Sequence, residues 1–542
     1  MGAKAILFST SIFFLFIFSS FWSCTRPPSY DLVITNATIV DGSGSERYQG
    51  MVAVNADTIA YVGNQIDFEA NEVIDAERKV VSPGFINMLS WAYNALLEDG
   101  RSLSDLKQGV TLEVFGEGRS PGPSGNPGEE DYQSFGDAMS ALEQNGVSTN
   151  VASYLGATTV RVQTVGYANR KATEEELADM KAIVETSMQE GALGIGSSLI
   201  YAPADYADTE ELVFLNKAAA PYNGRYISHM RSEGRAILEA LDELITVARE
   251  AQVPAEIYHL KASRQSNWHL LDSVIARVER AQAEGLQISA DMYTYNASST
   301  GLTGVIPTWV QEGGHRAWIE RMQDPKVRPR LLEDIRKELE EQPADGILMV
   351  GFNKPEMDAK YRGKTIAEVS AMRNTSPEET IVDLVVEDDS RIQCIYFSMS
   401  EDNIRKKIQL PWVSFSSDAG SYSDISKNFR THPRAFGSFI RVLGKFSRDE
   451  GLLSLEEAVR KLAHLPATNL GLEKRGLLQV GHYADLVLFD PETVTDHATF
   501  DEPLQFATGV SDVWVNGMQV LKNGDHTGVF PGKFVKGSGA IR

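Results

Sequence analysis

The sequence predicts an α/β protein in which a TIM-type (β/α)8 barrel is combined with a small β-sandwich built from both ends of the chain. Two observations support this prediction. The middle of the chain alternates strand-like and helical segments, whereas both ends carry alternating apolar and polar runs without helical segments. With 542 residues, the chain is long enough for a barrel-sized domain and a smaller second domain.

The two ends of the chain share the pattern of antiparallel strands. Residues 30–80 contain the runs YDLVITNATIVDG and MVAVNADTIAYVG, punctuated by turn residues such as Asp41-Gly42 and Gly63-Asn64. Residues 476–542 repeat the pattern in ADLVLFD and SDVWVNGMQVLKNG. We therefore expect residues 30–80 and 476–542 to pair into one β-sandwich, interrupted by everything between them.

Residues 81–475 are predicted to form the barrel, with predicted capping boxes such as Thr173 with Glu176 at the starts of helices. The region 303–411 breaks the rhythm, and we expect it to be a long insertion, partly a lid, between strands seven and eight. A doubly wound open sheet is the alternative, but the strand count favours the barrel. The eight strand candidates are VVSPGFINML, VTLEVFGEG, VSTNVASYLG, GALGIGSSL, YISHM, AEIYHLKA, LQISADMYTY and WVSFSSDAG.

The first 29 residues differ from the rest of the chain. Lys4 precedes the apolar run AILFSTSIFFLFIFSSFW, which ends at Ser23 and Cys24. This pattern predicts a bacterial lipoprotein signal over residues 1–23, with Cys24 lipidated and residues 24–29 acting as a tether. The expected location is the cell envelope, with the protein lipid-anchored and facing the periplasm or the exterior. An ordinary secretory signal or a single membrane anchor is the alternative.

Composition excludes some partners. A net charge of −23 and a pI near 4.9 repel phosphate backbones, so we expect no nucleic-acid partner. Besides Cys24, the chain has only Cys394, so a disulfide framework is not expected. The sequence does not indicate an oligomeric state.

A repeated motif indicates a metal site. Residues 227–231 read Ile-Ser-His-Met-Arg, and residues 257–261 read Ile-Tyr-His-Leu-Lys, one βα unit later. That spacing predicts His229 and His259 at the same level on neighbouring strands, at the barrel mouth where active sites form. Two neutral imidazoles there are good ligands for zinc. Either histidine alone would more often be structural, but the repetition favours ligands.

Asp418 is the predicted general base. It ends the apolar strand of WVSFSSDAG, where a buried carboxylate is costly without a partner. A metal-bound water would be such a partner, and the carboxylate could take its proton. The alternative is an N-cap for a following helix. Near the first histidine, Arg231 and Glu233 could simply pair with each other.

These residues resemble the amidohydrolase superfamily, specifically its N-acyl-D-amino-acid deacylase branch. The resemblance covers nearly all of the chain after Cys24, and the motifs follow the expected order. It implies the barrel and sandwich described above, a metal-dependent site and hydrolysis of an amide next to a carboxylate-bearing carbon. The motifs are VSPGFIN, QGVTLEVFGEG, EGALGIGSSLIYAP, YISHMRSEG, IYHLKAS, SSDAG, THPRAFGSFIRVLG, PATNLGL and GHYADLVLFD.

The sequence departs from that pattern at the first barrel strand. The superfamily carries His-X-His after this strand, whereas GFINMLSW places Leu89 and Trp91 there, so we expect the more buried metal site to be missing. The branch also uses a cysteine on the second strand, which is absent here. Glu117 in QGVTLEVFGEG is the nearest candidate for the third ligand, and Glu113 is its rival. We therefore expect one zinc ion per chain, with a degenerate, metal-free relative as the alternative.

The resemblance also implies substrate-binding residues. Lys261 and Arg434 are candidates to pair with a substrate carboxylate. Tyr201 and Tyr293 resemble family pocket residues, although either could be an ordinary buried aromatic.

The expected function is hydrolysis of the amide bond of N-acyl-D-amino acids or small D-configured peptides. One alternative is a cyclic-amide hydrolase of the dihydroorotase or hydantoinase kind. Those relatives usually bridge two metals, which the missing strand-one histidines argue against. The other alternative is a catalytically dead binding barrel. The sequence leaves the acyl group, the side-chain preference and the choice between D and L substrates open.

Overall fold

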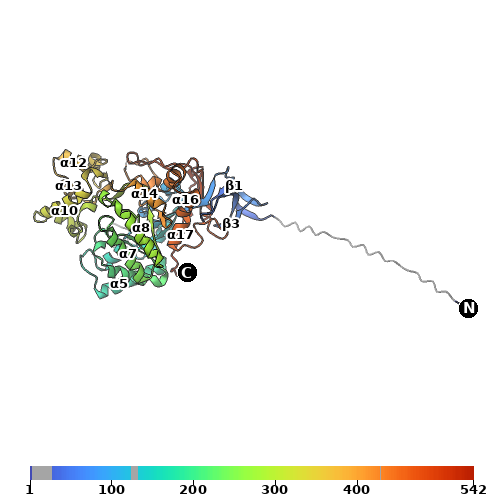
Figure 1. The fold of residues 1–542 in the computed structure, drawn as a ribbon, viewed down its shortest axis with the longest axis horizontal. Coiled ribbons are helices and arrows are strands. Elements are labelled where there is room, and N and C mark those ends of the chain that lie inside the picture. The colour runs from blue at the N-terminus through green and yellow to red at the C-terminus, as the bar shows by residue number, and fades with distance from the viewer. Residues whose placement is uncertain (3–26, 124–131, 428, 542) are drawn as a thin grey trace.

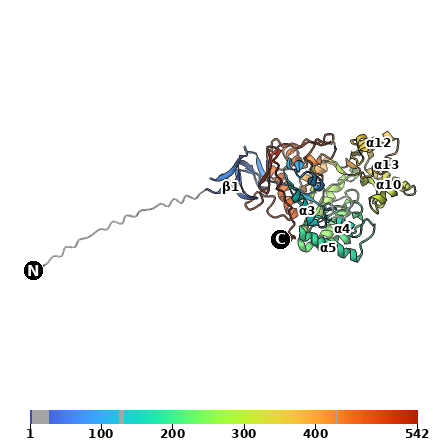
Figure 2. The same ribbon diagram turned by 180° about the vertical axis from the view of Figure 1, so that it is seen from behind.

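The protein is described here from a computed structural model, which covers residues 1–2, 27–123, 132–427 and 429–541. The predicted signal run and Cys24 lie outside the described residues. Within the described part of the chain, no helix is both long and apolar enough to cross a membrane. Figures 1 and 2 show the strands near the N-terminus at one end of the molecule and helices α10, α12 and α13 at the other.

Both ends of the chain contribute to one nine-stranded sheet. Its order is β21-β20-β19-β18-β5-β1-β2-β3, and β4 pairs with β1. The join lies between β5 and β18, which pair antiparallel with Val81 opposite Leu488. Trp514 of β19 packs with Ile34 and Val52 in the core of this sheet. The strands are β1 (Ser29–Ile39), β2 (Tyr48–Asn55), β3 (Thr58–Gly63), β4 (Glu69–Asp75), β5 (Val80–Pro83), β18 (Leu486–Phe489), β19 (Val510–Val515), β20 (Met518–Lys522) and β21 (Asp525–His526).

The middle of the chain forms two parallel sheets, β6-β7-β8 and β17-β13-β12-β11-β10-β9. Only Tyr154 separates β8 from β9, and the N–H of Leu193, which precedes β10, donates to the Ser153 carbonyl of β8 at 3.0 Å. At the other edge, the Met88 N–H donates to the Phe415 carbonyl at 3.4 Å, so hydrogen bonds link the two sheets at both edges. The strands are β6 (Phe85–Asn87), β7 (Val110–Phe115), β8 (Asn150–Ser153), β9 (Leu155–Gly156), β10 (Gly194–Ser198), β11 (Arg225–His229), β12 (Ala255–Ile257), β13 (Ile288–Met292) and β17 (Val413–Phe415).

Helices alternate with these strands and bury apolar side chains against them. The capping box predicted for Thr173 and Glu176 is present at the start of α5. The connecting helices are α1 (Tyr93–Glu98), α2 (Leu103–Leu106), α3 (Phe135–Asn145), α4 (Ala157–Thr164), α5 (Glu174–Glu190), α6 (Thr209–Ala219), α7 (Ile237–Ala251), α8 (Leu271–Ala283), α14 (Glu401–Ile408), α15 (Arg434–Arg441), α16 (Leu455–Val459) and α17 (Leu465–Leu470).

A separate unit is inserted between β13 and β17. It contains an antiparallel sheet of order β14-β16-β15, and its apolar core is distinct from that of the parallel sheets. Helix α14 lies within the range 303–411 predicted for the insertion, but Ile404 and Ile408 pack in the core of the parallel sheets. The inserted elements are β14 (Ser298–Gly301), α9 (His315–Gln323), α10 (Arg328–Glu341), β15 (Ile347–Gly351), α11 (Pro355–Tyr361), α12 (Ile366–Arg373), α13 (Pro377–Asp388) and β16 (Gln393–Tyr396).

Candidate active site

A cavity of about 760 Å³ lies between the carboxyl ends of the parallel strands and the inserted unit. Residues that follow β7, β11, β12 and β17 line its inner part, and β14 and β16 contribute to its outer wall. Parallel strands bring their carboxyl ends to one edge, which explains why segments far apart in sequence meet here.

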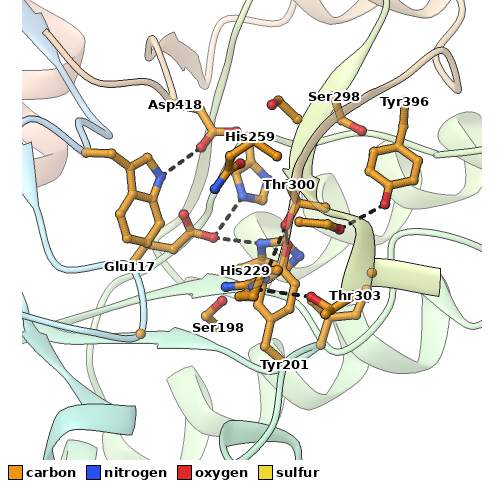
Figure 3. Close-up of a pocket in the computed structure, with 18 of the residues that line it drawn as sticks. Glu117, Ser198, Tyr201, His229, His259, Ser298, Thr300, Thr303, Tyr396 and Asp418 are labelled. Carbon is orange, nitrogen blue, oxygen red and sulfur yellow. Dashed lines mark hydrogen bonds and ion pairs between the residues drawn. The ribbon is translucent and has the colours of Figure 1, made fainter. Parts of the chain in front are cut away.

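Glu117, His229 and His259 form a compact buried cluster in this cavity (Figure 3). Glu117 Oε1 lies 2.6 Å from His229 Nδ1 and 3.2 Å from His259 Nε2. The two imidazole rings meet edge to face with their centroids 4.5 Å apart. One ligand atom from each residue lies within 4.8 Å of the others, an arrangement of donors that suits a zinc ion.

The local backbone explains how the cluster is presented. Gly118 follows Glu117 with a positive φ of 70°, and a Cβ there would lie 2.5 Å from the Ser198 side chain. His259 also has a positive φ, 35°, which is costly for a residue with a Cβ. Its N–H donates to Asp291 Oδ1 at 3.0 Å, so a buried carboxylate holds this turn in place.

The electrostatics of the cluster favour a bound cation. Burial and the charge of Lys261 lower the pKa of His259. The carboxylates of Asp418, Glu117 and Glu233 outweigh both and raise that pKa to about 10. Burial raises the pKa of Glu117, but its hydrogen bonds with the two histidines hold it well below its usual range. A site that stabilises a proton this strongly also suits a metal cation.

Glu233 has a role at the site that the sequence analysis did not assign. Its Oε1 accepts from Lys261 Nζ at 2.5 Å and lies 3.0 Å from His259 Nδ1. Lys261 Nζ also lies 2.7 Å from His259 Nδ1, so both Glu233 and Lys261 contact this nitrogen, while Nε2 faces Glu117. These contacts fix the orientation of the ring that presents Nε2 to the cluster. The predicted pairing of Arg231 with Glu233 is wrong, because Arg231 instead forms a two-pronged ion pair with Glu243. Sequence proximity alone could not show that the two side chains diverge.

Asp418 lies at the cavity wall beyond β17, with 8% of its surface exposed. Its Oδ2 accepts from Arg434 Nη1 at 2.6 Å, and its Oδ1 accepts from the Trp91 indole at 3.1 Å. Its φ is +48°, a second strained position at the site. The alternative of an N-cap does not hold, because the next α-helix within the described residues begins at Arg434.

The predicted substrate-binding residues lie around the same cavity. Lys261 and Arg434 line it, but each already pairs with a carboxylate of the site. The Tyr201 hydroxyl shares a hydrogen bond with Thr300 at 2.8 Å. Tyr293 is 1% exposed and lies behind the cavity wall, where its ring contacts the charged groups of Lys261 and Arg434.

Glu113, the rival third ligand, lies apart from the cluster. It is fully buried, and its carboxylate accepts hydrogen bonds from the hydroxyls of Ser90, Ser102 and Thr149. Of the two residues singled out after the first barrel strand, Leu89 is buried and Trp91 is half exposed in the cavity wall.

Comparison with known proteins matches residues 72–521 to the family model described as "Amidohydrolase family". The chain belongs to the amidohydrolase family. It is 32% identical over 517 residues to a D-aminoacylase of Alcaligenes xylosoxydans xylosoxydans, covering 93% of this chain and 97% of that protein. An N-acyl-D-glutamate deacylase of the same organism is 30% identical over 507 residues, covering 91% and 93%. The resemblance to the family and to its D-aminoacylase branch is therefore confirmed.

A solved structure of a deacylase is also similar to this chain. A crystal structure of N-acyl-D-glutamate deacylase from Bordetella bronchiseptica, in complex with zinc and a phosphonate inhibitor that mimics the tetrahedral intermediate, superposes with a TM-score of 0.79. That protein is 28% identical, and the match covers 94% of this chain and all of that one.

The metal ligands can be tested by substitution. Glu117→Gln should lower zinc affinity more strongly than the 10- to 100-fold expected for loss of a residue that only orients a ligand, because a neutral amide replaces an anionic donor. Glu113→Gln is the matched control and should bind zinc like the wild type. Competition against a chromophoric chelator measures both. Equal affinities of the two variants would contradict this assignment of the third ligand.

Glu113 should make stability depend on pH. Burial raises its pKa to about 8, so the folded protein retains a proton that the unfolded chain releases near its ordinary value of 4.5. The free energy of unfolding should therefore fall as pH rises from about 4.5 to about 8. In Glu113→Gln this fall should be smaller, whereas the exposed control Glu175→Gln should retain it. Urea titrations at several pH values measure the free energy of unfolding. The same dependence of that free energy on pH in all three proteins would refute the prediction.

Proposed function

We propose that this protein is a zinc-dependent hydrolase that cleaves the amide bond of N-acyl-D-amino acids. The observation that carries the proposal is the convergence of Glu117, His229, His259 and Asp418 on one cavity. The named activities of the relatives, which are at least 30% identical over more than nine-tenths of the chain, support the substrate class.

We also infer that the two parallel sheets form one closed barrel of the TIM type, with the nine-stranded sheet as a β-sandwich beside it. The hydrogen bonds of Leu193 with Ser153 and of Met88 with Phe415 support closure, because they link the sheets at both edges. The position of the cavity at the carboxyl ends of the strands fits active sites on this fold.

One zinc ion per chain is proposed, held by Glu117, His229 and His259. A zinc ion there supplies Lewis-acid polarisation of the scissile carbonyl and activation of water. Leu89 and Trp91, at the positions of the family's strand-one histidines, have no lone pair to offer a second ion.

Four residues of the chain are assigned to proton transfer and substrate binding. Asp418 accepts the proton of the attacking water and passes it to the departing amine. Lys261 and Arg434 bring positive charge to the side of the cavity where the substrate carboxylate binds. The Tyr201 ring lies edge-on to the His229 ring, and the Tyr201 hydroxyl orients the substrate.

Asp418→Asn tests the mechanism. The amide keeps the shape of the side chain but accepts no proton, so kcat should fall by about 10²- to 10⁴-fold with zinc content unchanged. Release of free amine from N-acetyl-D-amino acids, with the L-enantiomers and a cyclic amide such as a hydantoin in parallel, gives the readout. A variant that retains more than a tenth of the wild-type kcat would refute the role of Asp418. Turnover of the cyclic amide alone would replace the proposed reaction.

The cavity also suits a substrate with a second anionic group. The cavity-lining Arg391 is exposed, and among the described residues it forms no ion pair with a carboxylate. Its guanidinium lies over the Tyr201 ring, 5.1 Å from the centroid, and its Nε donates to Thr303. Since the Tyr201 ring in turn lies 5.3 Å from the His229 ring, an uncompensated cation faces the substrate close to the metal ligands. We infer a preference for acidic D-amino acids.

Arg391→Met tests that preference. It should lower kcat/KM for N-acetyl-D-glutamate by about 10- to 100-fold, because a charge-assisted hydrogen bond is lost. The neutral isostere N-acetyl-D-glutamine should change by less than about threefold. Arg264→Met is the control, since Arg264 already pairs with Glu338 and Glu341. An equal loss for both substrates would contradict the role of Arg391.

We further propose a lipid anchor at Cys24, on the basis of the apolar run that ends at Ser23. Cys24→Ser should release the protein from the membrane fraction or leave it unprocessed. Membrane fractionation and intact-mass measurement of the wild type and the Cys24→Ser variant test this proposal. Unchanged fractionation and mature mass would remove the anchor and the envelope location from the proposal.

A further inference from the structure

The Trp91 side chain makes an unexpected contact with the proposed general base. Its indole Nε1–H donates to Asp418 Oδ1 at 3.1 Å, across 327 residues of sequence. We propose that Trp91 is a positioning residue, which holds Asp418 in the orientation that accepts the proton. This inference rests on the proposed function, because it assigns a role within the same reaction.

The backbone presents both partners rigidly. The Trp91 N–H donates to the Ala419 carbonyl at 2.9 Å, and the Asp418 N–H donates to the Leu89 carbonyl at 2.9 Å. Leu89 itself is fully buried, so the segment that carries Trp91 is anchored in the core. Two reciprocal hydrogen bonds therefore fix the segments after β6 and β17 on either side of the contact between indole and carboxylate.

The Trp91 indole and the Arg434 guanidinium bind different oxygens of the Asp418 carboxylate. Arg434 Nη1 donates to Asp418 Oδ2 at 2.6 Å, while Nη2 makes only a long hydrogen bond of 3.3 Å to the Ser299 carbonyl. Arginine and carboxylate prefer a two-pronged pair in which both carboxylate oxygens are engaged. The Trp91 N–H holds Oδ1 away from that geometry and keeps the arginine contact single. Asp418 thereby retains an accessible lone pair for the proton, and Arg434 retains a donor for the substrate carboxylate.

An indole is chemically suited to this role. It donates one hydrogen bond, accepts none and does not titrate in the working pH range, so it orients the carboxylate without competing for the proton. Trp91 is half exposed at the cavity wall, yet its nitrogen contacts a carboxylate that is 8% exposed. In such a shielded position a hydrogen bond to a charged group is strong.

Two variants at position 91 test the indole N–H group. Trp91→Phe removes it together with part of the ring. Incorporation of 3-benzothienylalanine at position 91 replaces only the N–H by sulfur and retains the bicyclic shape. Both variants should lower kcat for N-acetyl-D-amino acids by about 10- to 100-fold, with KM within about threefold and zinc content unchanged. Trp318→Phe, a tryptophan of the cavity wall in the inserted unit, is the control and should keep kcat within twofold.

A spectroscopic readout is independent of turnover. With ¹⁵N-labelled tryptophan, the Trp91 indole signal is identified by its loss in Trp91→Phe. It should move in Asp418→Asn, whereas the other indole signals should stay in place.

The outcomes separate this inference from the proposed function. Wild-type kcat in the benzothienyl variant would overturn the positioning role, as would a loss confined to KM, which would make Trp91 a substrate contact. If the wild type cleaves no N-acyl amino acid, the proposed function fails and the positioning role, which presupposes it, is overturned as well. An indole signal that does not move in Asp418→Asn overturns the contact itself, whatever the activity.

Discussion

The cost of burying the Glu117 carboxylate shapes the rest of the site. Glu117 is 4% exposed and shares one oxygen with two imidazoles, and two more carboxylates, Glu233 and Asp418, lie nearby. Like charges this close are tolerated only if positive charge is placed among them. Lys261 and Arg434 neutralise the outer two carboxylates, which leaves the position between Glu117 and the histidines as the natural place for a cation. The roles of the surrounding residues follow from this balance of charge.

The parts of the site that follow from strand register could be predicted from sequence. His229 ends β11 and His259 lies two residues beyond the end of β12. The two strands are parallel neighbours with Ser228 opposite Ile257, so the repeated motif brought both histidines to the same edge of the sheet, although they are offset by one residue and not at the same level as predicted. Glu117 could be chosen over Glu113 because it lies after the end of β7, while Glu113 lies within the strand. Periodicity likewise indicated the alternation of strands and helices and the pairing of the two chain ends, because alternating apolar residues must find a second layer to be buried.

Contacts that depend on side-chain direction could not be predicted. Arg231 and Glu233 are two residues apart, yet one turns toward Glu243 and the other toward the metal ligands. Trp91 meets Asp418 only because the segments after the first and last parallel strands lie side by side. The sequence marked Trp91 only as a departure from the pattern it resembles, and nothing in the sequence showed that its N–H has a partner. The antiparallel sheet of the inserted unit, and with it the place of Arg391, also depended on pairing across about 90 residues.

The ion pair between Asp418 and Arg434 couples catalysis to substrate binding. One side chain is the proposed base and the other a proposed partner of the substrate carboxylate, and they share a single hydrogen bond of 2.6 Å. A substrate carboxylate that binds Arg434 would compete for that hydrogen bond, so the proposed base and the proposed carboxylate site share one contact. Trp91 would keep the Asp418 carboxylate oriented while the pull of the arginine changes, because its indole N–H holds Oδ1 independently of Arg434.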